Sequence, residues 1–511
     1  MNESRLGNTI RNARVSLFFY LIILLVTFYS RSFFIKQLGS DFVGLTTTML
    51  NIIGFLNLAE MGFASVIAFA LYKPLLERNK EETNEIVSVF GYIYRLIGYI
   101  IIFFGILLAI GVLFFFKNSG FDSTAILTVY LTYLITTLLG FFVNYKEVLL
   151  VADQKNYIKI SIYNNVRLAK IAVQMLAINY ISDSIYLWII LELIFLSSYS
   201  IFLNLKIKRI YPNLTSVVKQ GKELSHKYAF IFTKAKQAFF HKFSTLILQN
   251  TANVFVYFFS SLNMVTKYSN YIIISASIVT LLSSLFDSTN AAVGNLVAEK
   301  NTSRVLKVYW ELQVSRFWLA TSVVFTCFIT IDIFISSWVG NEFILDTNIK
   351  LFIILNLFIM IIRKTNDEFL GACGLFKDIW APITEIIINV AVMIICGRIW
   401  GVIGIPLGAF ISMGLIVIIW KPFFLYREFM PQKISIYVIN LAKYIIISLC
   451  TIYVVSKIPL FNNSAPDSYY KFLCIGVQRF FEMLIVSWIL FIIFTDEMRD
   501  FSKRFYKIIR K

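Results

Sequence analysis

The chain has 511 residues, of which 58% are hydrophobic and 15% are charged. Soluble globular proteins carry roughly 45–50% apolar and about 25% charged residues, so the composition excludes an ordinary soluble protein. The net charge of +18 would suit a nucleic-acid-binding protein if the basic residues formed one patch, but they recur in short groups between long apolar stretches.

The apolar stretches are long enough to cross a membrane as helices. A bilayer core about 30 Å thick needs about 20 apolar residues per span, and a helix satisfies its own backbone hydrogen bonds in lipid. Apolar runs between charged, Pro or Gly breaks predict about fourteen spans. In chain order they cover residues 15–36, 42–72, 87–116, 125–152, 157–180, 184–205, 243–264, 268–298, 311–338, 349–372, 378–398, 402–420, 436–456 and 470–494.

The distribution of Lys and Arg orients these spans. Basic residues accumulate in cytoplasmic loops. If the N-terminus is inside, the inside segments hold most of the Lys and Arg residues and the outside loops hold few, alternating along the chain. We therefore expect a multi-pass protein with both termini in the cytoplasm. Its longest external loop, residues 456–470, is too short for a catalytic domain.

The longest inside segment covers residues 206–242. Within it, Leu224, Tyr228 and Ile231 recur at helical spacing among lysines. This pattern favours a basic amphipathic helix on an anionic leaflet. A solvated linker is equally compatible with it.

The sequence carries traces of an internal repeat. One gapless self-alignment places Glu77-Arg78-Asn79 on Glu299-Lys300-Asn301, and also Asn144 on Asn366. Internal repeats are a common plan of secondary transporters, whose substrate sites lie near the repeat interface. We predict an N-lobe with spans 1–6 (residues 1–205), a basic cytoplasmic linker (206–242), a C-lobe with spans 7–12 (243–430), and a last part with two spans and a basic cytoplasmic tail (431–511).

Cationic side chains lie inside two of the predicted spans. In the fifth span, Tyr163, Arg167, Lys170 and Gln174 follow i, i+4, i+7, i+11, which places them on one helix face. Arg31 is a further cation in the first span. Each such residue costs roughly 2.5–3.5 kcal/mol at the bilayer centre. We predict that Arg31, Arg167 and Lys170 line an inward cavity and bind a multiply charged anion such as a phosphate head group.

Acidic residues also lie inside the predicted spans. We consider Glu60, Glu192 and Asp287 as candidates for ion coupling or for pairing between helices. The structural alternative is that these acids and the cations pair with each other and only hold the helices together.

Motifs of enzymes are absent from the sequence. No G-x-x-x-x-G-K-[ST], HExxH or G-x-S-x-G motif occurs, and the five cysteines and two histidines have no metal-ligand spacing. We therefore expect no catalytic residues, no metal, no cofactor and no nucleic-acid partner.

Three stretches resemble the Wzx-type polysaccharide (O-antigen and capsule) flippases of the MATE-like MOP superfamily. The first holds Leu38-Gly39, Val43-Gly44-Leu45, Leu58-Ala59-Glu60-Met61-Gly62 and Leu71-Tyr72-Lys73-Pro74-Leu75. The second holds Lys267-Tyr268-Ser269-Asn270-Tyr271 and Gly294-Asn295-Leu296-Val297-Ala298. The third holds Gly374-Leu375-Phe376-Lys377-Asp378 and Gly401-Val402-Ile403-Gly404-Ile405-Pro406-Leu407-Gly408.

The resemblance implies an all-α integral membrane fold with two six-helix lobes, two additional C-terminal helices and a central cavity. The implied activity is the movement of undecaprenyl-diphosphate-linked oligosaccharide from the cytoplasmic to the periplasmic leaflet of the bacterial inner (plasma) membrane, by alternating access. Implied partners are membrane lipids, a polysaccharide polymerase and other glycan-assembly proteins. Similar proteins often carry an acid in the seventh span where this chain has Asn253, which puts cation coupling there in doubt.

Two other functions compete with this one. A MATE-like drug/ion antiporter would share the fold but would favour an acidic, aromatic cavity, in contrast to the cations of the fifth span. An integral-membrane glycan polymerase or ligase would share the location but would normally need a sizeable external loop.

Overall fold

The computed structural model describes residues 5–60, 62–180, 184–299, 301–375, 377–430, 432–460 and 468–509. Met61, Lys300 and Phe376 of the sequence motifs lie outside the described residues. The chain forms two compact units, Met1–Thr266 and Lys267–Lys511. The described residues form helices joined by short turns and contain no strand.

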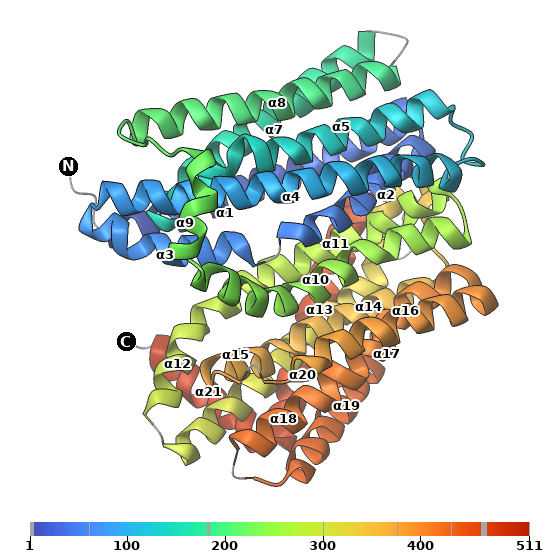
Figure 1. Ribbon diagram of the computed structural model, residues 1–511. Coiled ribbons are helices and arrows are strands. Elements are labelled where there is room, and N and C mark those ends of the chain that lie inside the picture. The colour runs from blue at the N-terminus through green and yellow to red at the C-terminus, as the bar shows by residue number, and fades with distance from the viewer. Residues whose placement is uncertain are drawn as a thin grey trace. The chain divides into compact units, whose positions relative to one another are not determined.

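The first unit is a bundle of long helices. Helices α4, α5, α7 and α8 lie side by side with their axes roughly aligned (Figure 1). Short 3-10 turns, Asn57–Glu60 and Asn144–Glu147, interrupt two of the helical paths. The helices are α1 (Arg5–Leu38), α2 (Ser40–Leu56), α3 (Phe63–Glu77), α4 (Lys80–Phe115), α5 (Ser123–Phe142), α6 (Val148–Ala152), α7 (Asn156–Tyr180), α8 (Ser184–Ile210), α9 (Gly221–Lys227) and α10 (Phe230–Phe259).

The boundary between the units lies within α11 (Leu262–Phe286). The second unit is again helical, and a π-helix, Gly414–Trp420, joins α17 to α18. Its helices are α12 (Asn290–Ala298), α13 (Thr302–Trp338), α14 (Thr347–Ile362), α15 (Lys364–Ala372), α16 (Trp380–Trp400), α17 (Gly404–Met413), α18 (Lys421–Glu428), α19 (Ile434–Ser456), α20 (Tyr469–Phe494) and α21 (Asp496–Ile509).

The helices confirm an all-α integral membrane fold. Each predicted span is occupied by one helix or by a short run of helices, as where α2 and α3 fill residues 42–72. Among the described residues, nine helices are long and apolar enough to cross a membrane. Helix α7, which carries Lys159, Arg167 and Lys170, is not one of them.

Helix α4 shows how the bundle meets lipid. It buries Ile93 and Ile97 against its neighbours and exposes Phe103, Ile106 and Ile110. Large apolar side chains exposed in a row would aggregate in water. They suit the hydrocarbon core of a bilayer, where no water has to be excluded.

The two units repeat one helix cap at the positions that the self-alignment superposes. The Asn79 side chain accepts a hydrogen bond from the Glu82 amide at the start of α4, and Asn301 accepts one from the Arg304 amide at the start of α13. Asparagine at this position satisfies a backbone donor that the helix leaves open. The two helices have 36 and 37 residues. The lobe boundaries at 205, 242 and 430 stay predictions.

The segment 206–242 differs from both expectations for it. Tyr228 and Ile231 are buried in the core of the first unit, and α9 lies so close to α4 that a Cβ on Gly221 would be 2.3 Å from the Ser88 carbonyl oxygen. The apolar face of the segment therefore packs on protein and does not face lipid or solvent. The sequence pattern identified the face but not what covers it.

A buried ion pair in the second unit joins α13 to α15. Arg316 is 1% exposed and donates to both carboxylate oxygens of Glu368 at 2.7 Å, and to the Thr365 hydroxyl at 3.0 Å. Removing one partner of such a pair leaves an uncompensated buried charge, which costs about 3–5 kcal/mol. We expect Glu368→Gln to lower the free energy of unfolding by that amount, measured as thermal unfolding of the purified protein in detergent.

The exposed pair of Arg304 and Glu299 supplies the matched control. Their side chains are 61% and 47% exposed, and such pairs contribute about 0–1 kcal/mol. Glu299→Gln should therefore leave the melting temperature nearly unchanged. Equal melting temperatures for the two variants would contradict a stabilising role for the buried pair.

Candidate functional site

The cationic stripe lies on α7, which packs against α1 and α8 in the first unit. The helix has 25 residues and is therefore about 37 Å long, enough to span a bilayer core. Arg167 lies about 17 Å from its N-terminal end. The structure thus places Arg167 and Lys170 near the middle of a membrane-length helix.

A cavity of 340 Å³, which we call the Arg167 cavity, opens beside the stripe. Its lining contains two cations, one carboxylate and several hydroxyl groups. The structure brings together Arg167, Lys170 and Glu192 of the predicted set in this cavity. The lining residues come from α2, α5, α7 and α8: Leu50, Ile53, Tyr133, Thr136, Thr137, Tyr163, Val166, Arg167, Lys170, Glu192, Leu196 and Tyr199.

Lys170 and Glu192 form an ion pair between α7 and α8. The Lys170 Nζ lies 2.5 Å from Glu192 Oε1, and the Gln174 amide donates to Glu192 Oε2 at 3.0 Å. The two charged side chains are only 13% and 7% exposed. Each charge therefore compensates the other. This is the arrangement expected if acids and cations inside the spans pair with each other to hold the helices together.

Arg167 has a different environment. Its Nη2 donates to the Thr27 hydroxyl of α1 at 3.3 Å. Within the described part of the chain, no carboxylate forms an ion pair with it. A guanidinium group has five donors, so Arg167 retains capacity for an anionic ligand in the cavity.

Arg31 lies on α1 one turn after Thr27, and therefore on the same face as the partner of Arg167. It is half-buried. It is not one of the residues that line the Arg167 cavity. Its predicted contact with a head group stays a prediction.

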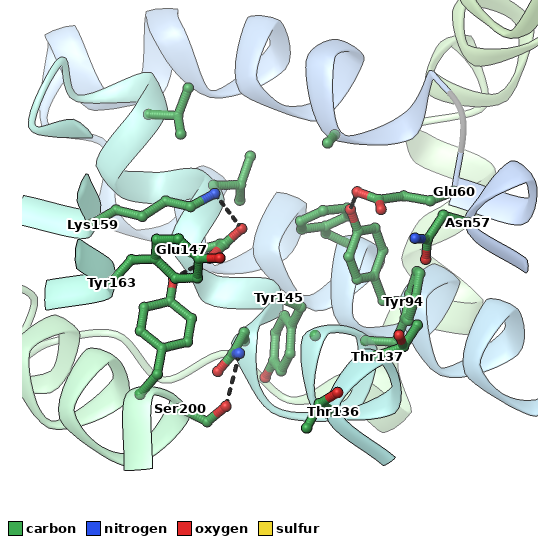
Figure 2. A pocket seen from close by; sticks show the side chains of 18 of the residues that line it. Asn57, Glu60, Tyr94, Thr136, Thr137, Tyr145, Glu147, Lys159, Tyr163 and Ser200 are labelled. Atoms are coloured by element: carbon green, nitrogen blue, oxygen red, sulfur yellow. Dashed lines mark hydrogen bonds and ion pairs between the residues drawn. The ribbon is translucent and has the colours of Figure 1, made fainter. Parts of the chain in front are cut away.

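A second cavity of 690 Å³, the Glu60 cavity, adjoins the first, because both are lined by Thr136, Tyr163 and Tyr199. Figure 2 shows Glu60 and Glu147 on opposite sides of it. The Tyr94 hydroxyl donates to Glu60.

Sequence reasoning missed Glu147 and Lys159 of this second cavity. Glu147 pairs with Lys159 Nζ at 2.7 Å and accepts a hydrogen bond from the Tyr199 hydroxyl at 3.2 Å. Lys159 precedes Tyr163 by one helical turn, so the spacing of the stripe could have identified it. Glu147 lies in a short turn, where helical spacing gives no signal.

Asp287 is separate from these residues. It lies in the second unit, where its carboxylate is 3.7 Å from the Lys364 ammonium group and its side chain is 57% exposed. The predicted acids therefore divide between the units, with Glu60 and Glu192 in adjoining cavities of the first. Asn253 of α10 has a buried Oδ1 without a hydrogen-bond partner among the described residues.

Comparisons with known proteins show the fold of the chain. No protein-family model matches the sequence, and no curated protein matches it. Among solved structures, the chain is similar to the lipid II flippase MurJ in an inward closed conformation, with a TM-score of 0.66 and 16% identity over 94% of this chain and 99% of that one.

Two further structures share the fold. An inward-facing multidrug resistance MATE family transporter of the MOP superfamily matches with a TM-score of 0.59 and 14% identity over 81% of this chain and 98% of that one. A MATE structure in the bent conformation matches with a TM-score of 0.51 and 12% identity over 83% and 95% of the respective chains. The chain therefore shares the MATE-like fold of these structures.

Proposed function

We propose that the protein moves undecaprenyl-diphosphate-linked oligosaccharide repeat units from the cytoplasmic to the periplasmic leaflet of a bacterial inner membrane. The units would serve the synthesis of surface polysaccharide, as O-antigen or capsule. The observation that carries the proposal is Arg167, a cation near the middle of α7 whose one described partner is a hydroxyl group. The fold shared with a lipid II flippase supports it.

A diphosphate fits the chemistry of the Arg167 cavity. A guanidinium group binds phosphate oxygens through two parallel hydrogen bonds, which are short and strong because both partners are charged. Lys170 would supply a second cation if the phosphate displaced Glu192 from it. Arg31, one turn from Thr27, would contact the same head group from α1.

Alternating access would carry the bound head group from one leaflet to the other. Glu60 and Glu192 are our candidates for ion coupling in the first unit, since each lines a cavity. Asp287 lies at the surface of the second unit beside Lys364, which favours helix pairing for it. Membrane lipids, a polysaccharide polymerase and other glycan-assembly proteins would be the partners.

Deleting the gene in its own bacterium tests this function. We expect lipid-linked repeat units to accumulate on the cytoplasmic leaflet and surface polysaccharide to disappear. The units can be located by their accessibility to a glycosidase added to intact spheroplasts. Accumulation on the periplasmic leaflet would contradict flipping and would instead indicate a glycan polymerase or ligase.

One observation favours a MATE-like drug/ion antiporter as a second candidate. The Glu60 cavity is lined by two carboxylates, Glu60 and Glu147, and one cation, Lys159, so it would attract cations. An antiporter would expel a cationic dye from proteoliposomes in response to a sodium or proton gradient. We expect no such export.

A further inference from the structure

A third cavity, of 690 Å³, lies in the first unit at the helix ends that the charge pattern assigns to the cytoplasm. We call it the Gln154 cavity. Its walls are the end of α3, the start of α4, the turn between α6 and α7, and the segment that follows α8. Asn8 of α1 completes it. Neither Arg167 nor Lys170 lines it.

Two amide side chains line this cavity, and one of them has a buried oxygen without a partner. The Oε1 of Gln154 is buried and makes no hydrogen bond among the described residues. Asn8, also in the lining, is 6% exposed. Buried polar groups are normally hydrogen-bonded, so the unpartnered oxygen of Gln154 points to a ligand.

The turn that carries Gln154 is held in place. The Asn12 amide donates to the Gln154 carbonyl oxygen at 2.9 Å, and its Oδ1 accepts a hydrogen bond from the Tyr157 amide at 2.7 Å. Gln154 (φ 56°) and Arg78 (φ 54°) are the non-glycine residues with positive φ among those described, and both line the cavity. Arg78 ends α3 and Gln154 follows the end of α6, positions at which helices commonly end on a left-handed residue.

The cavity is also positively charged. Arg78, Lys80 and Lys155 line it together with one carboxylate, Asp153. That carboxylate pairs with Lys155 at 2.7 Å and accepts a hydrogen bond from the Tyr211 hydroxyl at 2.8 Å. Three cations against one carboxylate give the lining an excess of positive charge, which favours an anionic ligand.

We propose that the Gln154 cavity binds a sugar that carries its own phosphate or other acidic group, and we assign it to a distal sugar of the lipid-linked substrate, apart from the diphosphate at Arg167. The amides of Asn8 and Gln154 offer both donors and acceptors to neighbouring hydroxyl groups. Arg78 and Lys80 would contact phosphate or other acidic groups. This assignment rests on the proposed function, and it names the part of the substrate that is recognised on the cytoplasmic side.

The three cavities are lined by residues that succeed one another along α7 and the turn before it. Lys155 lines the Gln154 cavity, Lys159 the Glu60 cavity and Arg167 the Arg167 cavity. Asn156, which begins α7 two residues after Gln154, is separated from Arg167 by about 17 Å along the helix. An extended oligosaccharide attached to a diphosphate at Arg167 could therefore place a distal sugar in the Gln154 cavity.

The test uses two substitutions that remove the amides without disturbing the fold. In Asn8→Leu an apolar group of similar size replaces the amide of a side chain that is 6% exposed. In Gln154→Gly a residue that adopts positive φ without strain replaces glutamine. We expect the double variant to unfold at or above the wild-type temperature. A lower melting temperature would indicate a structural role and would overturn the proposal.

Binding is measured on the full chain in phosphatidylcholine nanodiscs by saturation-transfer NMR, with glucose 1-phosphate, glucose and inorganic phosphate as probes. We expect glucose 1-phosphate to bind at least about tenfold more tightly than the other two, and the double variant to lose about tenfold, as expected for two hydrogen bonds. Asn179→Leu, the same change near the other end of α7 at an exposed position, should bind as wild type.

Suppression of binding by phosphatidylglycerol in the nanodiscs would assign the cavity to a lipid head group and overturn the sugar assignment. Equal binding of phosphate and glucose 1-phosphate, or unchanged binding by the double variant, would overturn the site. Arg167→Gln should retain sugar-phosphate binding, so a loss of flipping in that variant alone tests the proposed function separately.

Discussion

Replacing Arg167 with glutamine is expected to reduce surface polysaccharide at least about tenfold while the protein still reaches the membrane. A hydrogen bond to a charged group contributes about 1.5–3 kcal/mol, and each 1.4 kcal/mol corresponds to about a factor of ten. Glutamine ends two atoms short of the arginine Nη2, which donates to the Thr27 hydroxyl at 3.3 Å. The variant therefore removes both the charge and this contact with α1, so its amount in the membrane is measured together with the polysaccharide.

The measurement is complementation of a deletion strain, with surface polysaccharide quantified against the amount of protein in the membrane. Arg95→Gln is the matched control, because Arg95 is an exposed cation of α4 that lines neither the Arg167 nor the Glu60 cavity. Arg167→Lys should retain part of the activity, since it keeps the charge but loses two-point binding. Wild-type polysaccharide in the Arg167→Gln strain would remove Arg167 from the site.

Replacing Glu192 with glutamine is expected to destabilise the protein by about 3–5 kcal/mol, because Lys170 would remain buried and charged without its partner. The Lys170 Nζ lies 2.5 Å from Glu192 Oε1, and both side chains are largely buried from solvent. The double variant Lys170→Met/Glu192→Gln should recover most of that stability, since replacing both charges of a buried pair is often neutral. Thermal unfolding in detergent measures both effects.

Transport by the same double variant shows whether Lys170 binds substrate or only pairs with Glu192. If Lys170 contacts the diphosphate after Glu192 has moved away, the double variant should be stable but impaired in transport. Recovery of both stability and transport would show that the pair only joins α7 to α8. The Arg167 assignment does not depend on this outcome.

The helical spans could be predicted from the sequence because the bilayer imposes their length and polarity. About 20 apolar residues in a row have few alternatives to a membrane helix. The stripe of Tyr163, Arg167 and Lys170 was likewise predictable, because residues spaced by whole helical turns share a face whatever the rest of the fold does. Asn79 and Asn301, which the self-alignment superposes, both cap the start of a helix. Such a cap depends only on residues close in sequence, so the self-alignment could indicate it.

Pairings between helices could not be predicted in this way. Lys170 meets Glu192 only because α7 and α8 pack together, and Arg316 meets Glu368 only because α15 packs on α13. The same limit applies to Tyr228, whose burial depends on the close approach of α9 to α4. Local periodicity identifies a polar or apolar face, while the partner of that face depends on tertiary packing.

Movement of a lipid-linked diphosphate across a bilayer, the proposed function, can be measured directly in liposomes. The purified protein is reconstituted with a fluorescent undecaprenyl-diphosphate-linked oligosaccharide, and quenching of the fluorescence by an impermeant reductant is followed. We predict that the wild-type protein makes the inner-leaflet lipid accessible, and that Arg167→Gln does so at least about tenfold more slowly. Accessibility equal to that of protein-free liposomes would contradict the proposed function.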